Sequence, residues 1–148
     1  MVANMQLFKA LSPVSVLSFD LDDTLYDNSP VLAAAETAML SALVQHAPLT
    51  QNTDSEFWWQ QRRLLAQTTP DIRHDIGRWR LLGIEAGLTS LGLASCEAGE
   101  IAELAYSAFL AERTRINVQP QVKQLLSALA KRYKLIAITN GNACINKM

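Results

Sequence analysis

The chain has 148 residues, 49% of them hydrophobic, which is enough for one domain with a sizeable core. Its 13 basic and 14 acidic residues give a net charge of −1, so the composition offers no electrostatic case for binding nucleic acid or a membrane surface. Two cysteines do not make a disulfide framework, and the sequence has neither a signal-peptide pattern nor an apolar run of transmembrane length, so we expect a cytoplasmic protein.

The first predicted element is a buried strand over residues 14–18, which leads directly into Phe-Asp-Leu-Asp-Asp-Thr-Leu-Tyr at residues 19–26. In an extended segment Asp20, Asp22 and Thr24 point to the same side, because strand residues alternate faces. Two carboxylates this close repel each other unless a cation lies beside them, and Mg²⁺ prefers oxygen ligands. These residues predict a magnesium site, with a solvated Asp-rich turn or helix cap as the alternative.

The middle of the chain, residues 29–117, is predicted to be helical throughout. The Ser of residues 29–30 caps the first helix with Pro in its first turn, and residues 53–56 form a capping box for the second. Residues 69–71 open the third helix, and the fourth runs over residues 96–115, so we expect an up-and-down bundle. The side chains expected to face its core are Val31, Ala35, Ala38, Met39, Ala42, Leu43, Phe57, Trp58, Leu64, Leu65, Ile72, Ile76, Trp79, Gly83, Ile101, Leu104, Ala105, Ala108 and Phe109.

The last predicted elements are a helix over residues 120–133, with Pro120 in its first turn, and a parallel strand that begins at residue 134. That strand ends in Thr139, Asn140 and Gly141. A Thr hydroxyl and the backbone N–H groups of a Gly-containing loop are what a phosphate dianion needs for hydrogen bonds. An ordinary strand-to-turn exit is the alternative, since Asn-Gly is a common turn dipeptide.

The two polar segments that follow the predicted strands resemble the first and second motifs of the haloacid dehalogenase (HAD) superfamily. The first motif is Asp-x-Asp-x-Thr after a hydrophobic strand, matched at residues 20–24, and the second is a hydrophobic strand that ends in Thr or Ser, matched at Thr139. Within the superfamily, the chain resembles the bacterial phosphatases of flavin biosynthesis that act on 5-amino-6-(5-phospho-D-ribitylamino)uracil. The stretches that carry this likeness are residues 20–28, 74–75, 78–80 and 137–143.

The resemblance implies an α/β fold, in which a partial Rossmannoid parallel sheet receives an inserted four-helix-bundle cap of the C1 type. Residues 1–28 would form the first part of the HAD core, residues 29–117 the cap, and residues 118–148 the second part of the core. Such proteins continue with a Lys motif and a further Asp motif. We therefore expect this chain to be truncated before its third and fourth motifs and to be inactive by itself.

The resemblance also implies roles for the first-motif residues in Mg²⁺-dependent phosphomonoester hydrolysis. Asp20 would attack phosphorus to form an aspartyl-phosphate and would bind magnesium. Asp22 would act as general acid and base, and its main-chain carbonyl would be a second metal ligand. Thr24 would orient the loop. Dehalogenases and ion-pumping ATPases of this superfamily lack an Asp at the second position, so Asp22 excludes those relatives.

The remaining site residues expected from the resemblance bind substrate. Thr139, Asn140 and Gly141 would hold the phosphoryl oxygens. His74 and Arg78, at i and i+4 of the third predicted helix, would face the substrate, because cationic and hydrogen-bonding groups suit a phosphate ester. A solvated charged helix face is the alternative for this pair.

The expected partner is a small-molecule phosphate ester, and the full-length family favours a monomer. Two other functions stay open: a phosphosugar mutase or phosphonate hydrolase on the same scaffold, and a non-catalytic binding module or remnant. A Lys from the cap would mark the phosphonate case, and residues 29–117 contain none, which argues against it.

Overall fold

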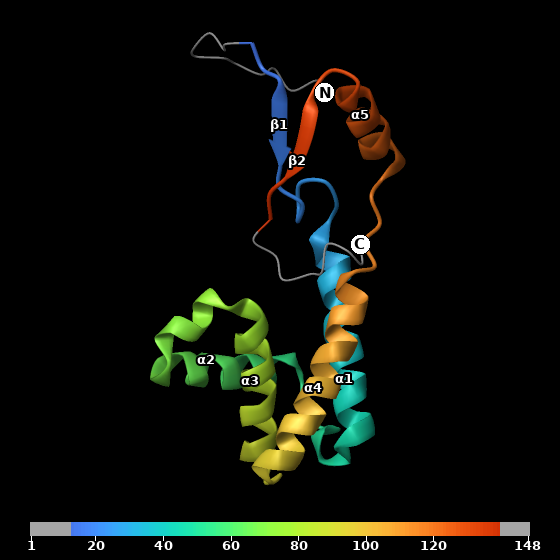
Figure 1. Cartoon of the computed structure of the whole chain (residues 1–148). Coiled ribbons are helices and arrows are strands. Elements are labelled where there is room, and N and C mark those ends of the chain that lie inside the picture. The colour runs from blue at the N-terminus through green and yellow to red at the C-terminus, as the bar shows by residue number, and fades with distance from the viewer. Residues whose placement is uncertain (1–12, 140–148) are drawn as a thin grey trace. The chain divides into compact units, whose positions relative to one another are not determined.

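The computed structural model describes residues 13–139 (Figure 1). These residues form two compact units, one from residues 13–26 and 117–139 and the other from residues 27–116. Across the described range, no helix is both long and apolar enough to cross a membrane. The predicted α/β fold, with helices inserted between two strands of a parallel sheet, is confirmed.

The smaller unit contains a parallel pair of strands. β1 (Val16–Phe19) pairs with β2 (Lys134–Ala137), and Phe19 lies opposite Ala137. One further main-chain bond extends the pairing past the end of β2, where the Ile138 N–H donates to the Phe19 carbonyl at 2.9 Å. Both strands therefore end at the same edge of the sheet, with their carboxyl ends in register.

The helix of this unit, α5 (Pro120–Ala130), begins at the predicted proline, whose fixed φ and missing N–H suit a first helical turn. It ends three residues earlier than predicted, because the N–H groups of Arg132 and Tyr133 both turn back to the Leu129 carbonyl at 2.9 Å. The unit buries little of its apolar surface: Leu125 of α5 is 56% exposed, and large side chains on both strands are also exposed.

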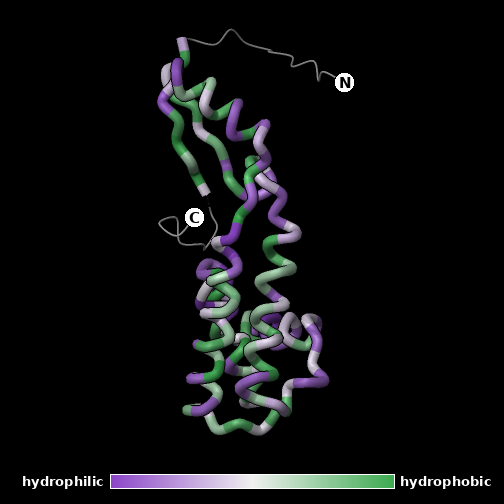
Figure 2. Tube along the Cα trace, turned by 90° about the vertical axis from the view of Figure 1, so that its right-hand side faces the viewer, coloured by the Kyte–Doolittle hydropathy of each residue, from purple (hydrophilic) through white to green (hydrophobic). Residues whose placement is uncertain are grey.

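The larger unit consists of helices. α1 (Asn28–His46) packs against α4 (Ser95–Arg113), α4 against α3 (Ile76–Ser90), and α3 against α2 (Ser55–Thr68). Figure 2 shows that hydrophobic and hydrophilic residues alternate along these helices, as expected for elements that bury one face. The buried core consists of Ala35, Met39, Leu43, Ala47, Trp58, Ile84, Leu88, Leu93, Ala98, Ile101, Ala102, Ala105 and Phe109.

Two helices begin at a different cap from the one predicted. Asp27, and not Ser29, caps α1, and its Oδ1 accepts a hydrogen bond of 2.9 Å from the Ser29 N–H. Asp54, and not Thr53, caps α2, and its Oδ1 accepts from the Phe57 N–H at 2.9 Å. At the N-terminus of each helix, the negative charge of the Asp carboxylate is also stabilised by the positive end of the helix dipole, whereas an uncharged hydroxyl gains no such stabilisation.

The third predicted helix is interrupted. A 3₁₀ turn, η2 (Pro70–His74), comes first, and α3 begins only after Asp75. The Asp75 backbone lies outside the helical region, and its Oδ1 accepts from the Arg78 N–H at 2.9 Å. Asp side chains compete in this way for backbone donors, which ends one helix and caps the next. The prediction of one continuous helix from residue 69 is therefore wrong.

Most of the predicted core positions are buried or partly buried, and three are not. Leu64, Ile76 and Leu104 are large hydrophobic residues that remain exposed, Leu104 by 50%. Leu64 and Leu104 each lie next to a residue that is less exposed, Leu65 and Ala105 respectively. The sequence pattern therefore assigns both leucines to the apolar face, although the rotation of about 100° per residue turns their side chains toward solvent. Ile76 is the first residue of the shortened α3.

Two glycines of α3 allow α2 to approach closely. A Cβ built on Gly83 would lie 2.3 Å from Cγ of Arg62, and one on Gly87 would lie 2.5 Å from Cζ3 of Trp58. The two positions are four residues apart and so share one face of α3. Trp58 is 2% exposed and is a rigid ring. The spacing of these two helices therefore depends on the absence of side chains at both glycines.

Buried arginines lie among the helices of the larger unit. The Arg80 guanidinium stacks over the Phe109 ring at 3.9 Å and lies 3.7 Å from Oε1 of Glu36. Within the described part of the chain, Nε and Nη1 of Arg80 lack hydrogen-bond partners. Burial lowers the pKa of Arg80, against the opposing charge of Glu36. Burial, with the charge of Arg80, also lowers the pKa of Arg62 to about 10.

The Arg80–Glu36 pair yields a prediction on stability. Glu36→Leu is expected to lower the free energy of unfolding by about 3 kcal/mol, the low end for breaking a buried ion pair, because it leaves a buried guanidinium without its counter-charge. Glu36→Leu combined with Arg80→Met should recover most of this loss, since the guanidinium that lost its counter-charge is then also removed. Urea denaturation followed by circular dichroism measures both. A double variant that is no more stable than Glu36→Leu contradicts this account.

Candidate active site at the carboxyl edge of the sheet

Residues with functional side chains follow both strands at the same edge of the sheet. Asp20 comes directly after Phe19, the last residue of β1, and is exposed. Thr139 comes two residues after Ala137, the last residue of β2, and is half-buried. Because Phe19 lies opposite Ala137 and accepts the hydrogen bond from Ile138, Asp20 and Thr139 leave neighbouring strands within one residue of the same level. Ligands of open α/β sheets bind at this edge.

The segment that follows Asp20 is a tight turn, where the sequence predicted an extended chain. The Leu21 carbonyl accepts hydrogen bonds from the N–H groups of Thr24, at 3.3 Å, and Leu25, at 3.0 Å. Asp23 adopts a positive φ of 58°, a conformation that Asp tolerates better than most residues. The first-motif side chains therefore do not follow the simple alternation of a strand, and Thr24 is exposed within the turn.

This turn brings Asp22 back against Tyr26. The two residues form a parallel bridge, and the Tyr26 hydroxyl donates a hydrogen bond to Oδ1 of Asp22. Tyr26 is 5% exposed and Asp22 is half-buried. The sequence interpretation missed Tyr26, although its spacing was a usable signal: a hydroxyl four residues after a carboxylate meets it when the chain makes one helical turn.

The first-motif loop offers oxygen donors of the kind that Mg²⁺ binds. Asp20 provides a carboxylate and Asp22 a main-chain carbonyl. Over residues 13–139, no group of three or more His, Cys, Asp or Glu side chains is arranged to hold a metal. Magnesium is usually held by one or two carboxylates, with phosphate oxygens and waters as its other ligands. The donors present fit a magnesium ion that is bound together with a phosphate, rather than one in an all-protein cage.

The cationic residues predicted to face substrate lie in the helical unit. His74 is the last residue of η2 and Arg78 lies in the first turn of α3, and both are exposed. Because Asp75 separates the two elements, His74 and Arg78 do not share the face of one continuous helix, which corrects the spacing argument. Arg78 lines a pocket of about 400 Å³ together with Leu65, Thr69, Asp71, Ile72, Asp75 and Leu82.

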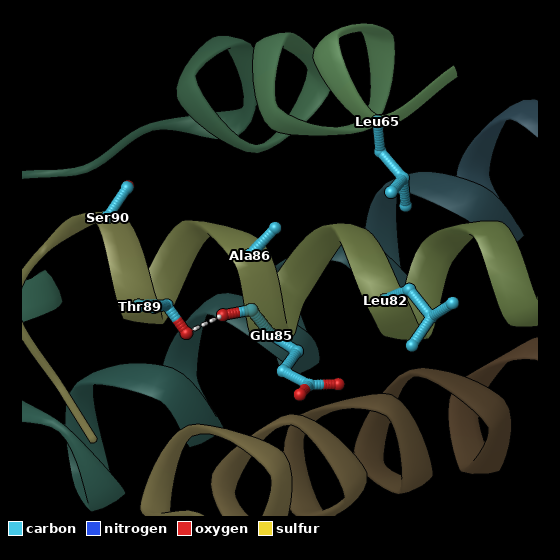
Figure 3. A pocket seen from close by; sticks show the side chains of 6 residues that line it. All are labelled: Leu65, Leu82, Glu85, Ala86, Thr89 and Ser90. Carbon is cyan, nitrogen blue, oxygen red and sulfur yellow. Dashed lines mark hydrogen bonds between the residues drawn. The ribbon is translucent and has the colours of Figure 1, made fainter. Parts of the chain in front are cut away.

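A second pocket, of about 500 Å³, lies along α2 and α3, where Leu65 points from α2 toward α3 (Figure 3). The Thr89 hydroxyl donates to the Glu85 carbonyl at 2.9 Å and the Ser90 hydroxyl to the Gly87 carbonyl at 2.7 Å, so both hydroxyls use their protons within α3. Its lining side chains are Leu65, Leu82, Glu85, Ala86, Thr89 and Ser90. This carbon-rich pocket with one carboxylate does not suit a phosphate.

Asn140 and Gly141, the other two residues predicted to bind phosphate, lie outside the described residues. Of the site residues predicted from the sequence, the structure brings Asp20, Asp22 and Thr139 to the end of one parallel strand pair.

The chain was compared with protein-family models, curated proteins and solved structures. No protein-family model matches the chain. The chain is 39% identical over 139 residues to the 5-amino-6-(5-phospho-D-ribitylamino)uracil phosphatase YigB of Escherichia coli (strain K12), a match over 94% of this chain and 58% of that protein. It is also similar to the crystal structure of a 2-haloacid dehalogenase from Pseudomonas syringae pv. Tomato DC3000, with a TM-score of 0.83, 33% identity, and coverage of 92% of this chain and 59% of that one. The chain thus spans less than two thirds of either relative.

Proposed function

We propose that this chain belongs to the haloacid dehalogenase-like superfamily and that its function is the magnesium-dependent hydrolysis of small phosphomonoesters. The observation that carries the proposal is that Asp20, Asp22 and Thr139 follow two paired parallel strands at the carboxyl edge of the sheet. In this proposal residues 1–28 and 118–148 belong to the catalytic core and residues 29–117 form the cap. The cytoplasmic location and a monomeric state stay predictions.

Asp20 is the nucleophile of the proposed reaction. Its carboxylate oxygen attacks phosphorus, the P–O bond to the substrate alcohol breaks, and an aspartyl-phosphate forms. The position of Asp20 supports this role. Its exposed carboxylate is accessible to an incoming ester, and it follows a strand whose backbone is held by hydrogen bonds to β2. Water then attacks phosphorus, which releases inorganic phosphate and regenerates the Asp20 carboxylate.

Asp22 is the general acid and base. It gives a proton to the departing alkoxide and takes one from the water that hydrolyses the aspartyl-phosphate, so it returns to its starting state after each turnover. Its half-buried carboxylate, two residues after the nucleophile, supports this assignment. An alkoxide needs such a proton, whereas a halide leaves as a stable anion without one. Asp22 therefore favours phosphatase chemistry over the dehalogenase activity named for the structural relative.

Phosphate binding is assigned to the loop that follows β2. The Thr139 hydroxyl and the Asn140 and Gly141 backbone N–H groups hold the phosphoryl oxygens, while Thr24 orients the first-motif loop. Asp20 and the Asp22 carbonyl would hold Mg²⁺. When bound, the ion supplies positive charge that offsets the carboxylates and the phosphate dianion.

The substrate alcohol is assigned to the helical cap. His74 and Arg78 would contact the substrate there, and exposed side chains at the junction of η2 and α3 are available for it. The likeness to a protein named as a 5-amino-6-(5-phospho-D-ribitylamino)uracil phosphatase makes this flavin precursor the first substrate to test.

The test is release of inorganic phosphate by the full-length protein with Mg²⁺ and a panel of esters: the ribitylaminouracil phosphate, a sugar phosphate and p-nitrophenyl phosphate. We expect turnover that EDTA abolishes and that added Mg²⁺ restores. A parallel assay for halide release from a 2-haloacid addresses the dehalogenase alternative. If no ester is hydrolysed, the phosphatase assignment is wrong and the non-catalytic alternative gains support. Conversion of one sugar phosphate into its isomer supports a mutase.

A further inference from the structure

The hydrogen bond from Tyr26 to Asp22 joins the most buried side chain of residues 20–26 to a residue of the proposed site. Tyr26 is 5% exposed, and its hydroxyl donates to Oδ1 of Asp22. The bridge between these two residues and the bonds from Thr24 and Leu25 to the Leu21 carbonyl hold the backbone on both sides of this contact. The donor thus comes from a packed ring and a fixed main chain.

A carboxylate in a loop can rotate about two side-chain bonds, and general acid catalysis needs one defined direction for its proton. A hydrogen bond to Oδ1 fixes the plane of the Asp22 carboxylate, and thereby the direction of Oδ2. A protonated carboxyl still accepts this hydrogen bond at Oδ1 while Oδ2 carries the proton, so the contact can hold the orientation of the acid form. The burial of Tyr26 restricts the movement of its ring.

We propose that Tyr26 is a positioning residue for Asp22, which it holds in the orientation that protonates the leaving alkoxide. The inference rests on the proposed phosphatase function and adds to it a residue outside the two motifs. Tyr26 acts through Asp22 and is not assigned a contact with the substrate.

The leaving group of the substrate separates positioning from a structural role. An alkoxide must be protonated as it departs, whereas p-nitrophenolate is a stable anion that departs without a proton. The ratio kcat/KM reports the steps up to departure of the leaving group, and so it isolates the step in which Asp22 acts as an acid. Loss of orientation should therefore affect alkyl phosphates and spare the aryl ester.

The experiment is Tyr26→Phe in the full-length protein, assayed with an alkyl phosphate and with p-nitrophenyl phosphate. General acid catalysis typically contributes ~10²–10⁴-fold, and the acid itself remains, so we expect kcat/KM for the alkyl ester to fall roughly tenfold. The value for the aryl ester should stay within about twofold, because its leaving group does not need the proton. Tyr133→Phe removes a hydroxyl from a half-buried Tyr of the same unit and should change neither value.

An equal fall for both esters, or no fall for either, overturns the positioning role. A second measurement does not depend on activity: crystal structures of the wild-type protein and Tyr26→Phe compare the Asp22 carboxylate directly. We expect one orientation in the wild type and a rotated or multiple orientation in the variant, and an unchanged carboxylate overturns the inference. If the wild type hydrolyses no ester, the proposed function fails, while these two structures still decide whether Tyr26 orients Asp22.

Discussion

Asp20→Asn is expected to lower kcat/KM for phosphate esters by at least about 10⁴-fold, because an amide does not provide the nucleophilic carboxylate oxygen of covalent catalysis. The substitution keeps the size of the side chain and adds no strain to the exposed position after β1. Phosphate release measures the loss. Acid quenching followed by mass spectrometry measures the aspartyl-phosphate, which should form on the peptide containing Asp20 in the wild type and be absent in the variant.

The matched control is Asp23→Asn, the same chemical change three residues later. Asp23 has a φ of 58°, and Asn is among the residues that adopt this conformation most readily, so the turn should persist. We expect activity within about threefold of the wild type, since the control keeps the nucleophile on which covalent catalysis depends. If Asp20→Asn retains activity, or if both variants lose it equally, Asp20 is not the nucleophile.

Gly87→Ala is expected to destabilise the helical unit by about 3 kcal/mol, at the upper end of the usual cost of overpacking a core. The new methyl group would lie 2.5 Å from Cζ3 and 2.9 Å from Cε3 of Trp58, and that ring is buried within the core. Either α2 or the indole must move, which opens contacts elsewhere. Thermal and urea unfolding, followed by circular dichroism and Trp fluorescence, measure the effect.

Gly99→Ala is the control for this substitution. Gly99 also lies within a helix, α4, but a Cβ at this position would meet no atom within 4 Å. Alanine has a higher helix propensity than glycine, so the free energy of unfolding of the variant should rise by about 0.5–1 kcal/mol. Opposite signs for the two substitutions are the signature of close packing at Gly87. A stabilised Gly87→Ala variant would show that α2 and α3 have room between them.

Most elements of this fold were predictable because each carries a local pattern of apolar residues. Short apolar runs that end in polar residues indicated β1 and β2, and apolar spacing with proline indicated α5. The caps were less predictable, because adjacent residues such as Thr53 and Asp54 compete for the same backbone donors. Only the local geometry decides between them. The break in the third predicted helix at Asp75 has the same origin. The apolar spacing continues through this residue, although its side chain binds a backbone N–H and so separates η2 from α3.

The candidate site was predictable in its residue types but not in its geometry. The motifs place carboxylates and a Thr after two strands, and parallel pairing then brings them to one edge. The contact between Tyr26 and Asp22 depends on the turn at Asp23, which an extended reading of the segment does not contain. The burial of Arg80 depends on Phe109, which lies in another helix, so its position in the sequence does not reveal it.

The two units differ in how much apolar surface each of them buries. The helices enclose a core of their own, whereas Val16, Ile136 and Leu125 leave the strands and α5 with carbon surface in water. Whatever covers these side chains, or binds at the sheet edge, is thermodynamically linked to the ordering of the first-motif loop. If the proposed function holds, a bound metal and phosphate should thus slow amide hydrogen exchange along β1 and β2, because binding and local folding are then coupled.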